Sequence, residues 1–292
     1  MIGLGELLWD LLPAGRQLGG APANFAYHAH ALGALAWPIS RVGIDALGRE
    51  VLDRLGALGL PTECIQIDSE APTGTVSVEM LPGGDHRFSI HEDVAWDRLE
   101  ATEAALSLAA RADAVCFGTL GQRAVDARDA VQRIAEATPP GSLRIFDVNL
   151  RQRYYSRAVI ERSLDIATIL KVNDVELPII AELLGIRDDC PTALSELAAR
   201  YDLNLVALTR GAAGSLLFAK GQVSDLPGDA VEIADTIGAG DAFTAALALG
   251  LQAGWDLDTV HRRAQAVATY VCTRPGATPA LPAAITSPFH AG

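Results

Sequence analysis

The chain has 292 residues, 50% of them hydrophobic and 20% charged, which supplies a large buried core and argues against a disordered protein. Its 36 acidic and 23 basic side chains give a net charge of −13 without any basic run, which argues against nucleic acid and membrane surfaces as partners. The cysteines lie far apart without metal-ligand spacing, and Met1–Glu6 lacks the basic region of a signal peptide, so we expect a cytoplasmic protein with reduced thiols.

Short apolar segments alternate with longer amphipathic segments through most of the chain. This alternation predicts βα units, a mostly parallel sheet and a single domain over residues 1–292, without an internal repeat. The predicted strands are Ile2–Leu4, Pro38–Val42, Ala114–Phe117, Leu143–Asp147, Ile169–Asn173, Leu205–Thr209 and Gly214–Phe218. The predicted helices are Ala23–Leu35, Gly48–Leu58, Ala124–Ala137, Arg157–Ala167, Asp174–Leu184, Thr192–Tyr201, Asp241–Ala253 and Asp256–Thr273.

Residues 73–93 follow a different pattern. Thr75–Glu79 and Arg87–His91 alternate polar and apolar side chains on either side of a Pro82-Gly-Gly-Asp85 turn, which predicts a β-hairpin. We expect the lid over a site at the edge of the sheet to be formed by inserted strands around residues 8–18 and 73–93. Because a bare strand edge is usually covered, the lid also predicts a homodimer.

The segment Asp235-Thr-Ile-Gly-Ala-Gly-Asp241 is a glycine-rich turn that opens into a predicted helix. A helix N-terminus offers unpaired N–H groups and the positive end of the macrodipole, so Gly238, Ala239 and Gly240 could bind an anion such as a phosphoryl group. Asp241 would then stand beside the anion as a base for an attacking hydroxyl. An N-cap is an equally good interpretation of this residue taken alone.

The segment Gly19-Gly-Ala-Pro-Ala-Asn24 also precedes a predicted helix. Its paired glycines allow a ligand to approach the backbone, Asn24 offers both a donor and an acceptor, and Asp10 follows the first strand. These groups suit a polyhydroxylated ligand, although a loop with a helix cap also explains the segment. Trp9, next to Asp10, fits either stacking on a sugar or packing of the lid.

Taken together, the two glycine-rich segments resemble the signatures of the ribokinase-like (pfkB) carbohydrate kinases, and the form Gly-Gly-Ala-Pro-Ala-Asn resembles their fructokinase branch. Further segments in the family's order extend the resemblance over nearly the whole chain: Arg41–Gly48, Asp147–Arg151, Asn173–Glu176 and Thr209–Gly214. The resemblance implies a three-layer α/β/α fold with a mostly parallel central sheet and a small β-lid. It also implies transfer of the γ-phosphoryl group of ATP to a sugar hydroxyl.

The resemblance further implies roles for single residues. The catalytic group would be Asp241 as base, with Gly238, Ala239 and Gly240 binding the transferred phosphoryl group. The sugar would be bound by Asp10, Gly20, Asn24 and Arg151. Phosphates and Mg²⁺ would be organised through water by Asn173 and Glu176, and the nucleotide lined by Thr209, Gly211, Gly214 and Gly276. Asp235 would take part in a monovalent-cation site suited to K⁺, although the loop around Gly276 also reads as a simple helix end.

Other classes fit the sequence less well. Its two lysines, Lys171 and Lys220, lie outside every glycine-rich loop, which excludes a P-loop kinase. Gly3-Leu-Gly5 has Leu8 where a dinucleotide-binding fingerprint needs its third glycine. We therefore expect a fructokinase. The alternative acceptors are ribose, 2-keto-3-deoxygluconate or a nucleoside, and a non-catalytic sugar sensor is the alternative of another class.

Overall fold

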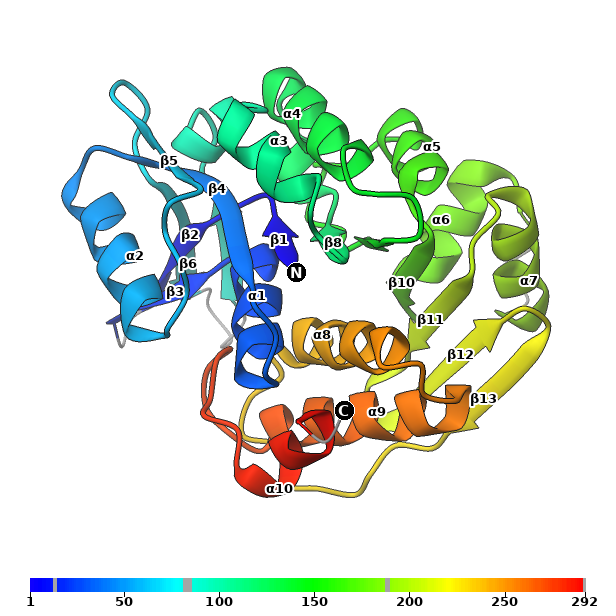
Figure 1. Ribbon diagram of the computed structural model, residues 1–292. Coiled ribbons are helices and arrows are strands. Elements are labelled where there is room, and N and C mark those ends of the chain that lie inside the picture. Colours follow the sequence, from blue (N-terminus) through cyan, green and yellow to red (C-terminus); the bar gives the residue numbers. More distant parts are fainter. Residues whose placement is uncertain (13–14, 81–85, 187–189, 291–292) are drawn as a thin grey trace.

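A large sheet between two layers of helices, with a small sheet at one end, forms the protein in the computed structural model (Figure 1). The structure describes residues 1–12, 15–80, 86–186 and 190–290. Within these ranges the large sheet has nine strands and the small sheet has four. The arrangement confirms the three-layer α/β/α fold expected from the sequence.

The strands of the large sheet lie in the order β13-β12-β11-β10-β9-β8-β1-β4-β5. Neighbours from β5 to β11 are parallel, whereas β12 and β13 are antiparallel. Their bounds are β1 (Ile2–Leu4), β4 (Trp37–Gly43), β5 (Ile65–Asp68), β8 (Ala114–Phe117), β9 (Leu143–Asp147), β10 (Ile169–Asn173), β11 (Leu205–Thr209), β12 (Ser215–Ala219) and β13 (Gln222–Leu226). The carboxyl ends of the parallel strands therefore meet along one edge, which is where open α/β sheets bind ligands.

The sequence did not predict the two edge strands β5 and β13 or the helix α3 (Glu103–Ala109). An edge strand buries fewer side chains than a central one, and Ile67 in β5 and Val223 in β13 are 47% and 59% exposed. The apolar run that marks a buried strand is therefore missing from both. Helix α3 has only seven residues, too few to establish a helical period.

Two helical layers cover the faces of the large sheet (Figure 1). On one face α3 to α7 pack over a core that contains Phe117 and Phe146, and on the other α1, α2, α8 and α9 pack over a core that contains Phe25 and Phe243. The remaining helix bounds are α1 (Ala21–Ala31), α2 (Ala46–Ala57), α4 (Val125–Glu136), α5 (Arg157–Ile166), α6 (Glu176–Leu184), α7 (Cys190–Arg200), α8 (Ala239–Gln252), α9 (Leu257–Cys272) and α10 (Ala283–Thr286). In the described part of the chain, none of the helices combines the length and the apolar composition needed to cross a membrane.

The small sheet joins the two segments that the sequence assigned to a lid. Its strands are β2 (Leu8–Leu12), β3 (Gly15–Gly19), β6 (Gly74–Met80) and β7 (His86–Ile90), in the order β3-β2-β6-β7. The β6–β7 pair is the predicted antiparallel hairpin, and its predicted turn lies outside the described residues. Because β2 follows directly from β1, the small sheet stands next to the carboxyl edge of the large one.

Candidate active site

Asn24 and Asp241, which are 217 positions apart in the sequence, form a hydrogen bond. Asn24 lies in the first turn of α1, and its Nδ2 donates to Oδ2 of Asp241 at 2.8 Å. Both helices begin two residues before their predicted starts, because Pro22 is tolerated in the first turn of α1 and Gly238 is the N-cap of α8. Asp241 is therefore a first-turn residue of α8, which excludes the interpretation of it as an N-cap.

The surroundings of Asp241 make its carboxyl group a weaker acid than usual. Burial raises the pKa of Asp241 to about 6, and the carboxylate of Asp147 adds to this effect. The hydrogen bond from Asn24 and the positive charges of Lys171 and Arg151 act in the opposite direction. A carboxyl group with this pKa is mostly ionised at neutral pH and still able to accept a proton from a hydroxyl.

The turn before Asp241 leaves backbone donors available at the N-terminus of a 14-residue helix. The N–H of Ala239 donates to the Thr236 carbonyl at 3.3 Å, whereas the N–H groups of Gly238 and Gly240 have no hydrogen bond to any part of the chain that the structure describes. Gly238 has a positive φ of 78°, and a Cβ there would lie 2.4 Å from the Ala277 carbonyl oxygen, so only glycine fits. Two of the three predicted amide donors are thus unpaired at the positive end of the helix dipole.

Lys171 lies directly beneath this turn. Its Nζ donates to Oδ1 of Asp147 at 3.0 Å, and a Cβ placed on Gly240 would come within 3.1 Å of the same Nζ. The hydroxyl of Thr244 lies 3.0 Å from Oδ2 of Asp147 and 2.9 Å from the carbonyl of Gly240. Burial disfavours the charged lysine, but Asp147 and Glu176 outweigh it and hold the pKa of Lys171 above its usual value.

The ammonium group of Lys171, paired with the carboxylate of Asp147, therefore lies next to the candidate anion site. Lys171 lies outside the glycine-rich loops, so the sequence motifs assign it no role. The sequence held one sign of this pairing: Lys171 stands between apolar residues in the predicted strand that became β10. A buried charge needs a partner, so a lysine at a buried strand position indicates a nearby acid.

Asp10 and Gly20 lie next to the start of α1, and the charge of Arg151, from the loop after β9, acts on Asp10. Asp10 pairs with Gln17 in the small sheet, and its Oδ2 would be 2.5 Å from a Cβ on Gly19, so the glycine lets the carboxylate approach the backbone. Gly20 has a positive φ of 118°, and a Cβ on it would lie 2.5 Å from the carbonyl oxygen of Glu6. The first glycine-rich segment therefore packs backbone against backbone on the end of β1.

Glu6 is a buried acid that the sequence analysis did not assign. Its side chain is 3% exposed, and Oε2 has no hydrogen-bond partner within the described structure. Burial raises the pKa of Glu6 to about 7. The charge of Arg151 lowers the pKa values of Glu6, Asp10 and Asp241, so three acids share the influence of one guanidinium at this end of the site.

Asn173 and Glu176 connect the loops that follow two strands. Oδ1 of Asn173 accepts hydrogen bonds from the N–H groups of Val175 and Glu176 at 2.9 and 2.8 Å. The two oxygens of Glu176 accept the N–H groups of Leu150 and Asn173, each at 2.9 Å. Glu176 thus ties the loop after β9, which carries Arg151, to the end of β10.

The other predicted nucleotide residues lie beside these loops or on the C-terminal segment. Thr209 is the register partner of Asn173, and Gly211 and Gly214 lie between β11 and β12 with positive φ. A Cβ on Gly214 would lie 2.1 Å from the Leu226 carbonyl oxygen, whereas one on Gly211 would meet nothing within 4 Å. Gly214 therefore serves chain packing, and Gly211 borders open space.

Asp235 joins the turn before α8 to the loop after α9. Its Oδ1 accepts the N–H of Ile237 and its Oδ2 accepts the N–H of Gly276, both at 3.0 Å. Each carboxylate oxygen keeps a lone pair for a further partner. Gly276, which the resemblance assigns to the nucleotide site, is therefore held against the turn that carries the unpaired amides.

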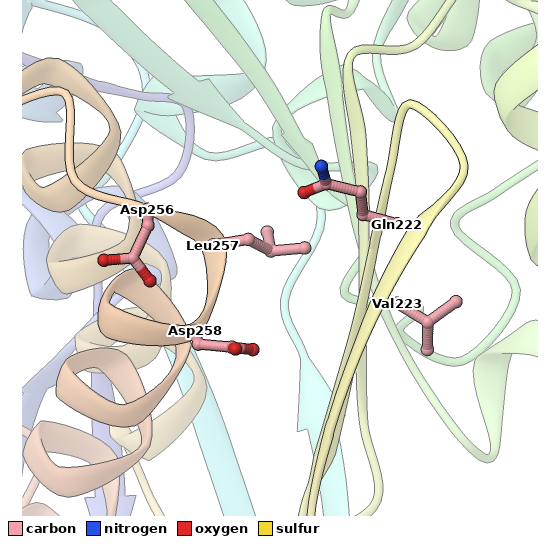
Figure 2. A pocket seen from close by; sticks show the side chains of 5 residues that line it. All are labelled: Gln222, Val223, Asp256, Leu257 and Asp258. Atoms are coloured by element: carbon pink, nitrogen blue, oxygen red, sulfur yellow. The ribbon is translucent and has the colours of Figure 1, made fainter.

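Two surface cavities lie away from these residues. One, of about 400 Å³, lies between β13 and the start of α9, where Leu257 and Asp258 face the strand that carries Gln222 and Val223 (Figure 2). The other, of about 380 Å³, lies around Met1 at the amino ends of the strands. Neither is lined by a predicted site residue.

Trp9 is 4% exposed and its indole N–H donates to the Leu47 carbonyl, so it packs inside the protein and does not offer its ring to a sugar.

Comparison with known proteins assigns this constellation to a family. The model of the pfkB family carbohydrate kinases matches residues 14–284. The chain is 31% identical to the fructokinase of Klebsiella pneumoniae, over 96% of this chain and 95% of that protein. It is also 31% identical to the putative sugar kinase PH1459 of Pyrococcus horikoshii, over 94% and 90% of the two chains.

Solved structures agree with this assignment. The crystal structure of the Pyrococcus horikoshii protein superposes with a TM-score of 0.83 at 30% identity, covering 94% of this chain and 92% of that one. The fructokinase of Xylella fastidiosa with bound ATP superposes with a TM-score of 0.86 at 21% identity, covering 99% and 97%, and shows the same fold. With its two glycine-rich segments meeting at one site, the chain belongs to the pfkB family of carbohydrate kinases, which transfer a phosphoryl group to an alcohol.

Proposed function

We propose that the protein transfers the γ-phosphoryl group of ATP to a hydroxyl of fructose, with Asp241 as the catalytic base. The observation that carries this proposal is the position of the Asp241 carboxyl group, which Asn24 orients and which follows the unpaired N–H groups of Gly238 and Gly240. A base and an anion site next to one another are what transfer from ATP to an alcohol requires.

In this reaction the sugar oxygen attacks the γ-phosphorus, and the bond between that phosphorus and the oxygen that bridges it to the β-phosphate breaks. The sugar hydroxyl gives its proton to Asp241, and ADP leaves with the bridging oxygen. The amides of Gly238 and Gly240, with Lys171 beneath them, would stabilise the negative charge of the transferred group. The lid of β2, β3, β6 and β7 would exclude water, which otherwise competes with the sugar as acceptor.

ATP would bind along Asn173, Thr209, Gly211 and Gly276, with Mg²⁺ on its phosphates. Among the described residues no group of three or more acidic, histidine or cysteine side chains could hold a metal ion. This fits Mg²⁺, which is usually bound through substrate phosphates, waters and one or two carboxylates and not in a protein cage. Glu176 and Asn173 would hold it through water, and the ion would supply positive charge at the phosphates.

Fructose is supported by the 31% identity to a protein named fructokinase, and by the charges at the acceptor end. Three acids, Glu6, Asp10 and Asp241, lie within the influence of Arg151, and Asp241 also within that of Lys171. A carboxylate on the substrate would meet these acids, so a neutral polyol is favoured over a sugar acid such as 2-keto-3-deoxygluconate. Ribose and nucleosides remain neutral alternatives.

Asp241→Asn tests the base. We expect turnover to fall by about 10²-fold to 10⁴-fold. The dissociation constants of ATP and of the sugar, measured by calorimetry, should stay close to those of the unaltered chain. Unchanged turnover would rule out the assignment. An ADP-release screen over fructose, glucose, ribose, 2-keto-3-deoxygluconate and adenosine identifies the acceptor, and release with none of them would favour a non-catalytic sensor.

Further parts of the proposal concern K⁺, assembly and location. The free lone pairs of Asp235 suit a K⁺ ion, and repeating the screen with and without K⁺ tests this. The lid would also form a homodimer, because β3 and β7 are its edges within the described residues. Leu11 on the inner strand β2 adds an apolar side chain that is 36% exposed. A monomeric mass by light scattering would contradict the dimer. A cytoplasmic location is proposed with them, because ATP is the phosphoryl donor.

A further inference from the structure

His28 is a fully buried residue of α1 whose side chain reaches the other end of the chain. Its Nε2 lies 2.9 Å from the carbonyl oxygen of Ala277, 249 positions away. Burial lowers the pKa of His28 to about 4, so the ring is neutral at physiological pH. A carbonyl oxygen only accepts, so Nε2 carries the proton and donates it to Ala277.

The other ring nitrogen of His28, Nδ1, makes no hydrogen bond within the described structure that would explain a polar side chain at this buried position. A leucine at this position would remove the unpaired Nδ1, but it would also leave the Ala277 carbonyl without its donor. The polar side chain therefore has one use here, which is to bind the carbonyl of Ala277.

That carbonyl lies against the turn that carries the unpaired amides. A Cβ on Gly238 would lie 2.4 Å from the Ala277 oxygen and 2.8 Å from the Ala277 Cα. Gly238 is the N-cap of α8, in the left-handed conformation. The Ala277 carbonyl is thus in contact with Gly238 and bonded to His28, and any movement of Ala277 changes the packing of the first turn of α8.

Neighbouring contacts hold the same loop from α1 and from the turn. The hydroxyl of Tyr27 donates to the Pro279 carbonyl at 3.0 Å, and Oδ2 of Asp235 accepts the N–H of Gly276. Asn24, one helical turn before His28, donates to Asp241 in α8. One helix therefore fixes both the base and the loop that packs on the anion-binding turn.

We propose that His28 is a positioning residue for phosphoryl transfer: its Nε2–H holds the Ala277 carbonyl against Gly238 and thereby fixes the first turn of α8 where the transferred group binds. The residue acts through Ala277 and touches neither substrate. The inference rests on the proposed function, since it assumes that the amides of Gly238 and Gly240 bind the phosphoryl group.

The test compares His28→Leu with His28→Gln. Leucine keeps the volume without a donor, whereas the amide nitrogen of glutamine can restore the donor. We expect the leucine variant to raise the KM for ATP or lower kcat by about tenfold, the usual effect of losing one buried hydrogen bond, with the KM for the sugar unchanged. The glutamine variant should recover most of this loss. His30→Leu, on the same helix and beside Gly59, is the matched control and should behave as the unaltered chain.

If His28 has a purely structural role, both His28 variants should have a lower melting temperature, and the KM for ATP should not change relative to the KM for the sugar. Equal losses in the leucine and glutamine variants, or unchanged kinetics in a folded leucine variant, would overturn the inference. If the leucine variant does not fold, Tyr27→Phe removes only the hydroxyl donor to Pro279. A selective rise in the KM for ATP then supports the inference, and its absence refutes it. Failure of the proposed function appears separately, as unchanged turnover in Asp241→Asn.

Discussion

Replacing Asn24 by leucine removes the hydrogen bond to Asp241 while keeping a side chain of similar size. In the unaltered protein this bond favours the ionised form of Asp241 and opposes burial and Asp147, and the resulting pKa is about 6. Without the bond, the carboxyl group holds its proton more tightly. The base should then become active only at higher pH.

The size of the change follows from the type of bond. A hydrogen bond to a charged group contributes about 1.5 to 3 kcal/mol, and one pKa unit corresponds to about 1.36 kcal/mol, so the pKa of Asp241 should rise by about one to two units. At pH 7 the unaltered enzyme has about nine tenths of this carboxyl group ionised, given a pKa of about 6, and the variant should have about half or less.

The assay is kcat/KM as a function of pH, because this ratio reports the pKa values of the free enzyme, which is the form that the structure describes. Direct detection of ADP between about pH 5 and 9 avoids a coupling enzyme that itself titrates. The acid limb should lie near pH 6 for the unaltered chain and move upward for Asn24→Leu. Asn204→Leu, in an exposed loop before β11, is the matched control.

Asn24 is also proposed to contact the sugar, so the variant loses activity at every pH. A uniform loss changes the height of the profile and not the position of its acid limb. If the limb stays near pH 6 in Asn24→Leu while activity falls, then either Asp241 is not the titrating base or the hydrogen bond does not set its pKa. Either outcome would refute the reasoning.

Three further changes test other parts of the site. Glu6→Gln should stabilise the protein relative to the unaltered chain as the pH rises. The pKa of Glu6 is about 7 in the folded chain against its ordinary value of 4.5, so the folded form binds the proton more tightly, and the unaltered chain loses stability as the pH rises between these values. The loss has an upper limit of about 3 kcal/mol, which urea unfolding at several pH values would detect. A difference between variant and parent that does not change with pH would contradict this assignment. Lys171→Met should lower the free energy of unfolding by about 3 to 5 kcal/mol because it leaves the buried carboxylate of Asp147 unpaired, and adding Asp147→Asn should recover part of it; equal losses in the single and double variants would argue against the pairing. Gly238→Ala should abolish most activity in a folded protein, since its Cβ would lie 2.4 Å from the Ala277 oxygen; normal kcat would show that the turn tolerates displacement.

Much of the local structure could be read from the sequence. The apolar runs of the central strands and the periodic helices are properties of single segments, and the structure confirms them. Strands β5 and β13 could not be predicted, because an edge strand exposes some of its apolar side chains and therefore lacks the continuous apolar run of a central strand. The start of α8 was set two residues late, since the left-handed conformation of Gly238, and with it the location of the N-cap, depends on close packing against Ala277.

The sequence by itself determined the family-like motifs, the glycines that keep backbone groups accessible, and the acid that follows them. The tertiary structure alone decided which of these groups meet: Asn24 with Asp241, Lys171 with Asp147, and His28 with Ala277. Such contacts join residues whose separation along the chain carries no local signal. They exist because the strand order brings the ends of β1, β9 and β10 to one edge, where burial makes each polar group depend on a partner from a distant segment.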